Sequence, residues 1–297
     1  MKIICLIFSF LMIMPAAWAD EFALPKNLSI ALPKDGSVKI EWIAPPLAEN
    51  QVQKANLQQQ RFHLDSRGAA WVCYNQKYLA DFSSGLSFSL KQPIQDFVFL
   101  KDNALFLLTD KSLVTVALFS QDKLSYKPIL ELLFQPVCGL PLTQCGLIAD
   151  PSGRMFIFGF DAKNRQYAVY QLLKDFSSWR KIFVSNEKIF CAAAQTDAVY
   201  IASGRMIFKI PLKAKEAEKI IFSHPLETIQ SLAYISGTGL FYATASGMGL
   251  VTEQGGLEFM KSQQPQTAAW QDQLYVFLPN SLGLLRLTNT NQLTSKQ

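Results

Sequence analysis

The sequence predicts an all-β protein, a six-bladed β-propeller of four-stranded antiparallel blades. A turn-forming residue is followed, three positions later, by an aromatic residue that opens a short apolar run. This pairing recurs six times, roughly every 40 residues, a period typical of solenoids and propellers. Further short apolar runs separated by turn residues follow each pairing, as in a meander of antiparallel strands. The six pairs are Gly68–Trp71, Asn103–Phe106, Gly153–Phe156, Asp197–Tyr200, Gly239–Tyr242 and Asp272–Tyr275.

The third unit carries the pattern in full. An apolar run at 146–149 is followed by a turn at 150–153, in which Asp150 can hydrogen-bond the backbone, Pro151 fixes φ and Gly153 accepts a positive φ. Further runs follow at 154–160, 166–173 and 179–184. Four such strands form one propeller blade.

The other units are expected to repeat this plan. A β-sandwich is the alternative; it would also place turns every 8–12 residues or so, but it needs no longer repeat. The predicted strands are 61–64, 69–74, 78–82 and 86–90 in the first unit; 97–100, 105–108, 113–118 and 126–132 in the second; 189–194, 198–202, 206–210 and 219–222 in the fourth; 229–235, 240–243, 250–251 and 257–260 in the fifth; and 267–270, 274–278 and 284–287 in the sixth.

The sixth unit lacks a fourth strand, because only a polar segment follows residue 287. An uncovered edge strand would invite aggregation. Two alternating segments near the N-terminus, 28–32 and 38–42, flank a turn at Lys34-Asp35-Gly36. We predict that Val38–Trp42 completes the sixth blade and closes the ring. Residues 20–60 would be an N-terminal extension with a connector at 45–60, and 61–297 would form a single propeller domain with 28–42.

The first nineteen residues predict a signal peptide. Lys2 supplies a positive charge, residues 3–14 are apolar, and Ala17-Trp18-Ala19 is an A-x-A cleavage pattern. The apolar run is shorter than the roughly 20 residues that span a bilayer; an uncleaved anchor is the alternative. We expect a mature chain from Asp20, exported to the periplasm or secreted, without a transmembrane segment.

The formal charge of +5 is scattered along the chain. The densest basic cluster, 213–219, also contains Glu216 and Glu218. Nucleic-acid binding needs a basic footprint, so no nucleic-acid partner is expected. We expect a monomer whose partner is a protein or glycan of the cell envelope.

Four cysteines remain after cleavage, and an even number in an oxidising compartment suggests disulfides. Cys138 and Cys145 bracket a turn-rich loop, and we predict a disulfide between them. Cys73 and Cys191 lie in apolar runs and are expected to be small buried side chains. No C-x-x-C or Cys/His spacing indicates a metal site.

Two segments, Asp65–Val72 and Asp150–Ile157, carry the full pattern Asp-x-x-Gly-x-x-aromatic-aliphatic. This pattern resembles the blade signature of NHL-type propellers and of the regucalcin/gluconolactonase group, fully in two blades and loosely in four. The resemblance implies the architecture. A gluconolactonase-like enzyme would hold a metal on inward-pointing carboxylates and an Asn at the centre of the ring, and the predicted inner strands are poor in such groups. We therefore assign no metal, no cofactor and no catalytic residue.

Five residues are candidates for ligand binding at the channel mouth: Arg61, His63, Asp96, Glu227 and Trp270. Arg61 and His63 lie in the first strand of the first unit. Asp96 and Glu227 stand near the starts of inner strands, and a solvated loop position is the alternative for both. Trp270 could stack on a sugar or pack between blades.

No HExxH, GxSxG or phosphate-binding loop is present. We therefore expect a non-catalytic binding or scaffold module for an envelope protein, peptide or glycan. The alternatives are a metal-dependent lactonase or other hydrolase with its site at the mouth of the central channel, and a purely structural component of an envelope assembly.

Overall fold

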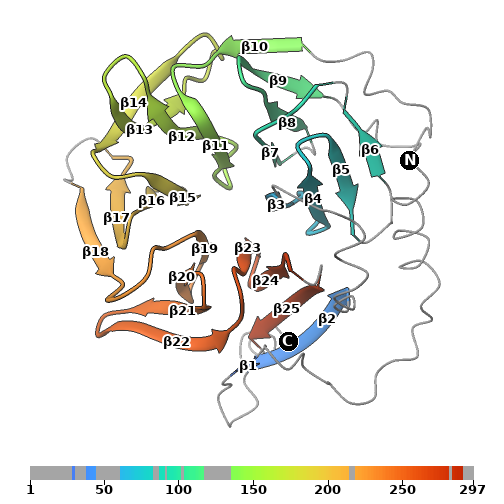
Figure 1. The fold of residues 1–297 in the computed structure, drawn as a ribbon, viewed down its shortest axis with the longest axis vertical. Helices are drawn as coiled ribbons and strands as arrows, with labels where there is room; N and C mark the ends of the chain where they lie inside the picture. The colour runs from blue at the N-terminus through green and yellow to red at the C-terminus, as the bar shows by residue number, and fades with distance from the viewer. Residues whose placement is uncertain are drawn as a thin grey trace.

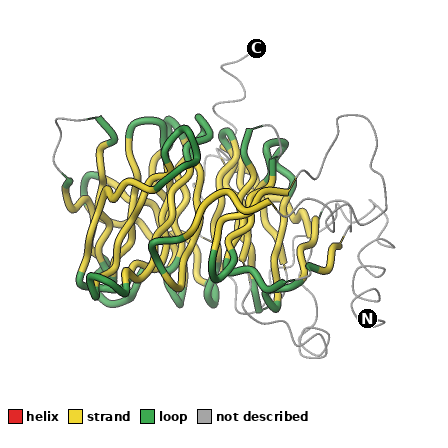
Figure 2. The backbone as a smooth tube through the Cα atoms, turned by 90° about the horizontal axis from the view of Figure 1, so that it is seen from above, coloured by secondary structure: helices red, strands yellow, loops and turns green. Residues whose placement is uncertain are grey.

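A computed structural model describes residues 29–30, 38–44, 61–82, 87–90, 92–101, 104–116, 135–213, 218–280 and 283–289. Its strands form six antiparallel sheets arranged as blades around a central axis (Figure 1). Seen from the side, the strands run between two faces made of loops (Figure 2). The predicted six-bladed propeller is therefore confirmed. The predicted signal peptide and the 45–60 connector lie outside the described residues.

The strands of a blade follow one another from the channel outward. Innermost strands are β3, β7, β11, β15, β19 and β23. The blades are β3(Arg61–Leu64), β4(Ala70–Tyr74), β5(Tyr78–Asp81) and β6(Ser87–Ser89); β7(Asp96–Phe99), β8(Leu105–Leu108), β9(Ser112–Val116) and β10(Gln135–Gly139); β11(Thr143–Ala149), β12(Met155–Asp161), β13(Gln166–Leu172) and β14(Trp179–Ser185); β15(Ile189–Ala194), β16(Ala198–Ser203), β17(Met206–Pro211) and β18(Lys219–Ser223); β19(Ser231–Ile235), β20(Gly239–Ala243), β21(Gly247–Thr252) and β22(Gly255–Lys261); and β23(Gln266–Trp270), β24(Gln273–Leu278) and β25(Gly283–Asn289).

The outer strand of the second blade differs from the prediction. It is β10, which pairs with β9, whereas the predicted strand at 126–132 lies outside the described residues. Pro136 stands in β10, next to a shift in register. Proline is tolerated at a sheet edge because its missing N–H would face away from the partner strand. Pro136 and Gly139 made this segment resemble a turn.

The N-terminal segment closes the ring as predicted. Strand β2(Val38–Ala44) pairs antiparallel with β25 and becomes the outer strand of the sixth blade. Arg286 of β25 donates to Glu41 of β2 through Nε at 3.1 Å. The short strand β1(Ser29–Ile30) pairs with β22 instead, so the fifth blade has five strands. The two N-terminal strands therefore pair with two different blades, the fifth and the sixth.

The repeated turns are built by their aspartates. Buried Asp65 accepts the N–H groups of Arg67 and Ala69 at 2.8 and 2.9 Å. Asp150 accepts those of Ser152 and Arg154 at the same two distances. Each turn ends on a glycine in the left-handed region, with φ of 83° at Gly68 and 86° at Gly153. The two full copies of the sequence pattern are therefore the same turn.

The six aromatic residues of the repeat are core residues. Each is less than a tenth exposed, and they lie in hydrophobic clusters that pack neighbouring sheets together. Trp71, for example, packs against Phe99 of the next blade with ring centroids 5.2 Å apart. Large aromatic side chains bury the most apolar area per residue. The repeat therefore builds the ring and leaves the functional groups to other positions.

Candidate functional site

The centre of the ring is a cavity of about 1110 Å³ that is lined along the inner strands of all six blades. Ligand sites in proteins typically occupy about 300–1,000 Å³, so this cavity is large enough for a small molecule. All six inner strands run in the same direction along the channel. Their first residues therefore meet at one end of the channel, which we call the mouth.

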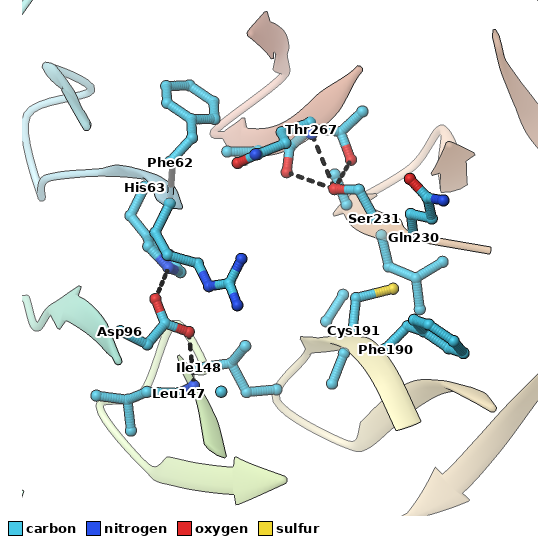
Figure 3. A pocket seen from close by; sticks show the side chains of 18 of the residues that line it. Phe62, His63, Asp96, Leu147, Ile148, Phe190, Cys191, Gln230, Ser231 and Thr267 are labelled. Carbon is cyan, nitrogen blue, oxygen red and sulfur yellow. Dashed lines mark hydrogen bonds and ion pairs between the residues drawn. The ribbon is translucent and has the colours of Figure 1, made fainter. Parts of the chain in front are cut away.

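A hydrogen-bonded pair lines one wall of the cavity (Figure 3). His63 Nε2 lies 2.9 Å from Asp96 Oδ1, and the ring of His63 packs edge-on against Phe97 with centroids 4.8 Å apart. The other oxygen of Asp96 accepts the N–H of Leu147 at 2.9 Å. Asp96 thus connects three consecutive blades through β3, β7 and β11, and it holds the imidazole in one orientation.

The pKa of Asp96 reflects these contacts. Burial raises it, but the charge of His63, the hydrogen bond from His63, the nearby Arg61 and the Leu147 N–H together lower it below its usual range. The carboxylate is therefore ionised in the folded protein. It bonds to Nε2 of His63, so Nδ1 is the ring nitrogen that lies outside this hydrogen bond.

On the opposite wall, an uncharged pair of side chains links the inner strands of two further blades (Figure 3). Ser231 Oγ of β19 accepts the N–H of Thr267 of β23 at 2.9 Å and lies 3.0 Å from its Oγ1. Asp96 and Ser231 occupy corresponding places at the starts of their strands. Both satisfy an N–H of the next blade's inner strand, so each has a structural role as an inter-blade connection.

The mouth itself is lined by amides and by two cations. A glutamine, arginine or lysine stands at or near the start of each of the six inner strands. We call this set the mouth ring: Arg61, Gln95, Gln144, Lys188, Gln230, Gln264 and Gln266.

Charges in the mouth ring are of one sign. Arg61 belongs to the first blade and Lys188 to the fourth, so the two cations come from opposite sides of a six-bladed ring. Lys188 Nζ lies 4.9 Å from the centroid of Phe190, which also lines the cavity. Among the described lining residues Asp96 is the one carboxylate, and it is 3% exposed.

Two glutamines of the mouth ring have an unusual backbone. Gln144 and Gln264 adopt φ of 52° and 50°. Gln144 lies three residues before Leu147, and Gln264 lies three residues before Thr267. The N–H groups of Leu147 and Thr267 donate hydrogen bonds to the preceding blade. The left-handed region is disfavoured for residues with a Cβ, and such residues cluster at functional sites. The chain therefore keeps an amide at two places where glycine would fit the backbone better.

The metal implied by the resemblance does not fit these residues. The described part of the chain holds no group of three or more His, Cys, Asp and Glu placed to bind an ion. Both oxygens of Asp96 already accept hydrogen bonds, from His63 and Phe97 on one and from Leu147 on the other. A hard cation needs several oxygen ligands, which these side chains do not supply.

The structure brings together three of the five predicted ligand-binding residues. Arg61, His63 and Asp96 line the cavity, and the solvated-loop alternative is wrong for Asp96, which is buried. Glu227 lies outside the lining and accepts the N–H of Ser246 at 3.2 Å. Trp270 is also outside the lining, because its indole packs over Gly68 and donates to Ser66 O at 3.2 Å. It joins the sixth blade to the first.

The predicted disulfide is not formed, since Cys138 and Cys145 are both free thiols. Cys138 lies on the outer strand β10 of one blade and Cys145 on the inner strand β11 of the next, so the loop between them spans the blade instead of closing on itself. Burial and the charge of Asp96 raise the pKa of Cys145 to about 12. Cys73 is buried as expected, whereas Cys191 lines the cavity.

The sequence reasoning missed the glutamines of the mouth ring and Lys188. An isolated glutamine or lysine carries no motif, unlike the carboxylates and histidines that mark most catalytic and metal sites. A detectable signal was present: a glutamine or a cation recurs within two residues of the start of every predicted inner strand. Alignment of the six units with one another would have revealed it.

No helix in the described part of the chain is long and apolar enough to cross a membrane. No protein-family model matches the sequence, and no curated protein matches it. Solved structures do match. A gluconolactonase from Xanthomonas campestris is 10% identical, with a TM-score of 0.60 over 91% of this chain and 99% of that one.

Two further structures match over 76% of this chain. A luciferin-regenerating enzyme is 14% identical, with a TM-score of 0.59 over 90% of its own length. Regucalcin, a calcium-binding protein from Agrobacterium tumefaciens, is 13% identical, with a TM-score of 0.58 over 88%. Identities this low establish the fold alone. The chain is thus a six-bladed β-propeller structurally similar to the regucalcin and gluconolactonase group.

Proposed function

We propose that this protein is an exported binding module that holds a polar group of an envelope glycan or peptide in the mouth of its central channel. The mouth ring is the observation that carries the proposal. It places amide and cationic side chains from all six blades around one opening. The rigid, closed ring supports it further, because a preformed site loses little entropy when it binds.

The chemistry of the mouth ring suits recognition. Each glutamine amide can donate and accept, which matches the hydroxyl and amide groups of glycans and peptides. Gln95 has one fixed role, because its Oε1 accepts the N–H of Cys145 at 2.6 Å. This bond leaves the two N–H donors of its amide for a ligand. Gln144, Gln230 and Gln264 are exposed at the opening.

The test is a binding screen with the purified mature protein. Soluble envelope oligosaccharides and short envelope peptides are added, and binding is followed by the shift in melting temperature and by calorimetry. Gln230→Ala should weaken binding at least fivefold without lowering the melting temperature. Gln254→Ala, an exposed glutamine in a rim turn outside the cavity, is the matched control. Equal loss in both variants would refute a site at the mouth.

A hydrolase is the second candidate, because His63 is held by a buried carboxylate. In that case Nδ1 would take a proton from a water molecule that attacks an ester or lactone carbonyl, and the proton would pass to the departing alkoxide. Hydrolysis of p-nitrophenyl acetate and δ-valerolactone by wild type and His63→Gln, with and without a chelator, tests it. Equal rates for both proteins would exclude this role. Loss of activity with the chelator alone would favour the metal-dependent lactonase instead.

A further inference from the structure

We infer that the ligand of the mouth ring is a saccharide that carries a carboxylate. This inference rests on the proposed function and adds the class of ligand to it. It follows from the charges of the mouth ring, from the hydrogen-bonding character of its amides and from the backbone of two of them.

Charge comes first. The mouth ring has two cations, Arg61 and Lys188, and no acidic residue. The one carboxylate of the described lining, Asp96, is buried and already bonded to His63 and to two backbone N–H groups. Two cations and one carboxylate leave the described lining with a net positive charge, and a concave site with such an excess attracts anionic ligands. An arginine fork binds carboxylates with two parallel hydrogen bonds.

The arrangement of the amides around an opening favours a sugar over a peptide. A sugar hydroxyl is both donor and acceptor, as each glutamine amide is, so neighbouring hydroxyls can bond to amides from successive blades. A peptide bound in extended form gains affinity from a sheet edge and specificity from side-chain pockets. The mouth ring consists of amides and cations around an opening instead. A ring of hydroxyls therefore suits it better.

The backbone gives an independent reason to regard the amides as functional. Gln144 and Gln264 hold corresponding places in two blades and share the left-handed conformation. Gln271 adopts φ of 55° too, but it lies outside the cavity lining. Gln271 therefore offers a control with the same residue type and the same backbone conformation.

The first experiment compares matched ligands by calorimetry. N-acetylmuramic acid is compared with N-acetylglucosamine, and glucuronic acid with glucose; acetyl-Ala-Ala and its amide form the peptide arm. The acidic sugar of each pair should bind at least tenfold more tightly than the neutral one. This ratio of affinities should fall at least fivefold in Arg61→Gln and in Lys188→Gln. Lys174→Gln, an exposed lysine outside the cavity, should leave it unchanged.

The outcomes separate the two proposals. If the neutral and acidic sugars bind equally and Gln230→Ala weakens both, the proposed function stands and the inference fails. If the peptide acid binds more tightly than either sugar, the assignment to a saccharide is wrong. If neither sugars nor peptides bind, the proposed function and the inference both fail.

The second experiment replaces a strained glutamine by glycine. Gln144→Gly should leave the melting temperature unchanged or raised and should lower affinity for the acidic sugar at least fivefold. Gln271→Gly should change the melting temperature in the same way but should leave the affinity for the acidic sugar unchanged. If both variants bind as wild type does, the conformation of Gln144 serves the turn alone and the inference loses this support.

Discussion

Asp96 shows how one side chain can serve both the ring and the site. Its carboxylate joins β3, β7 and β11 and fixes the imidazole of His63 at the cavity wall. Ser231 makes the corresponding connection between β19 and β23 without a charge. The two residues therefore allow the contribution of charge to be separated from that of the hydrogen bond.

We predict that Asp96→Asn lowers the free energy of unfolding at pH 7 by about 2–4 kcal/mol, because buried N–H groups and His63 lose a charged partner. Since the pKa of Asp96 is lowered in the folded protein, its contribution is present above its unfolded pKa of about 3.9 and is lost as the pH falls through that value and below it. Urea unfolding from pH 7 to pH 3 measures this.

Ser231→Ala is the control for this prediction. Its side chain carries no titrating group, so its difference from wild type should stay constant with pH. The difference between wild type and Asp96→Asn should instead shrink in acid. A pH-independent difference for Asp96→Asn would mean that the carboxylate contributes shape and hydrogen bonding only.

The turns between first and second strands connect blades as well as strands. Gly68 and Gly153 end equivalent turns with nearly the same φ. A Cβ on Gly68 would lie 2.7 Å from the indole of Trp270, whereas one on Gly153 would meet nothing within 4 Å. The glycine of this turn thus packs against a neighbouring blade in the first blade but not in the third, where Arg154 donates to the backbone oxygen of Thr196 in the fourth blade instead.

We predict that Gly153→Ala costs about 1 kcal/mol, from the left-handed backbone alone. Gly68→Ala should cost a further ~1–3 kcal/mol, because the indole must move from its place. Thermal unfolding of both variants measures the difference. Trp270→Leu in the Gly68→Ala background should reduce that difference. Equal costs in the two single variants would show that Trp270 adjusts freely.

At the level of elements, most of the fold could be predicted from the sequence because the turn residues and aromatic residues act locally. The Asp-x-x-Gly turns, the six buried aromatic residues and the closing strand at 38–42 were all detectable. Strand β10 was missed because Pro136 and Gly139 belong to the composition of turns, and only pairing with β9 makes that segment a strand.

The site was predictable only in part, because it is assembled from positions about 40 residues apart. His63 and Asp96 were found as candidates by residue type, yet their contact depends on the ring. Trp270 and Glu227 were expected at the mouth from their places in the sequence. Trp270 instead packs where the sixth and first blades meet, and Glu227 bonds to the turn between β20 and β21. The mouth ring is made of common residues, which single-sequence reasoning passes over.

The whole ring depends on a strand from the other end of the chain. Strand β2 covers the outer edge of β24–β25, and β1 adds to the edge of β22. Open edges with unpaired N–H and C=O groups promote association between chains. The N-terminal segment therefore stabilises the sixth blade and protects two edges.

We predict that removal of residues 38–44 lowers the melting temperature by at least 5 °C and causes aggregation, because β25 becomes an open edge. A synthetic peptide of residues 38–44 should restore both. Removal of residues 20–30, which takes away β1 and leaves β2, should have the smaller effect. Light scattering and calorimetry provide the measurements. A monomeric, equally stable product of the first deletion would refute closure by β2.

Ring closure also sets the order of folding. Glu41 and Arg286 bond across a separation of 245 residues, so β2 must wait for β25, which is synthesised much later. Contacts between such distant residues slow folding, because the loop-closing entropy is lost before they form. Five blades can assemble from neighbouring strands while the sixth stays open. The completed ring, and a mouth with all six sides in place, therefore form only once β25 has been synthesised and has paired with β2.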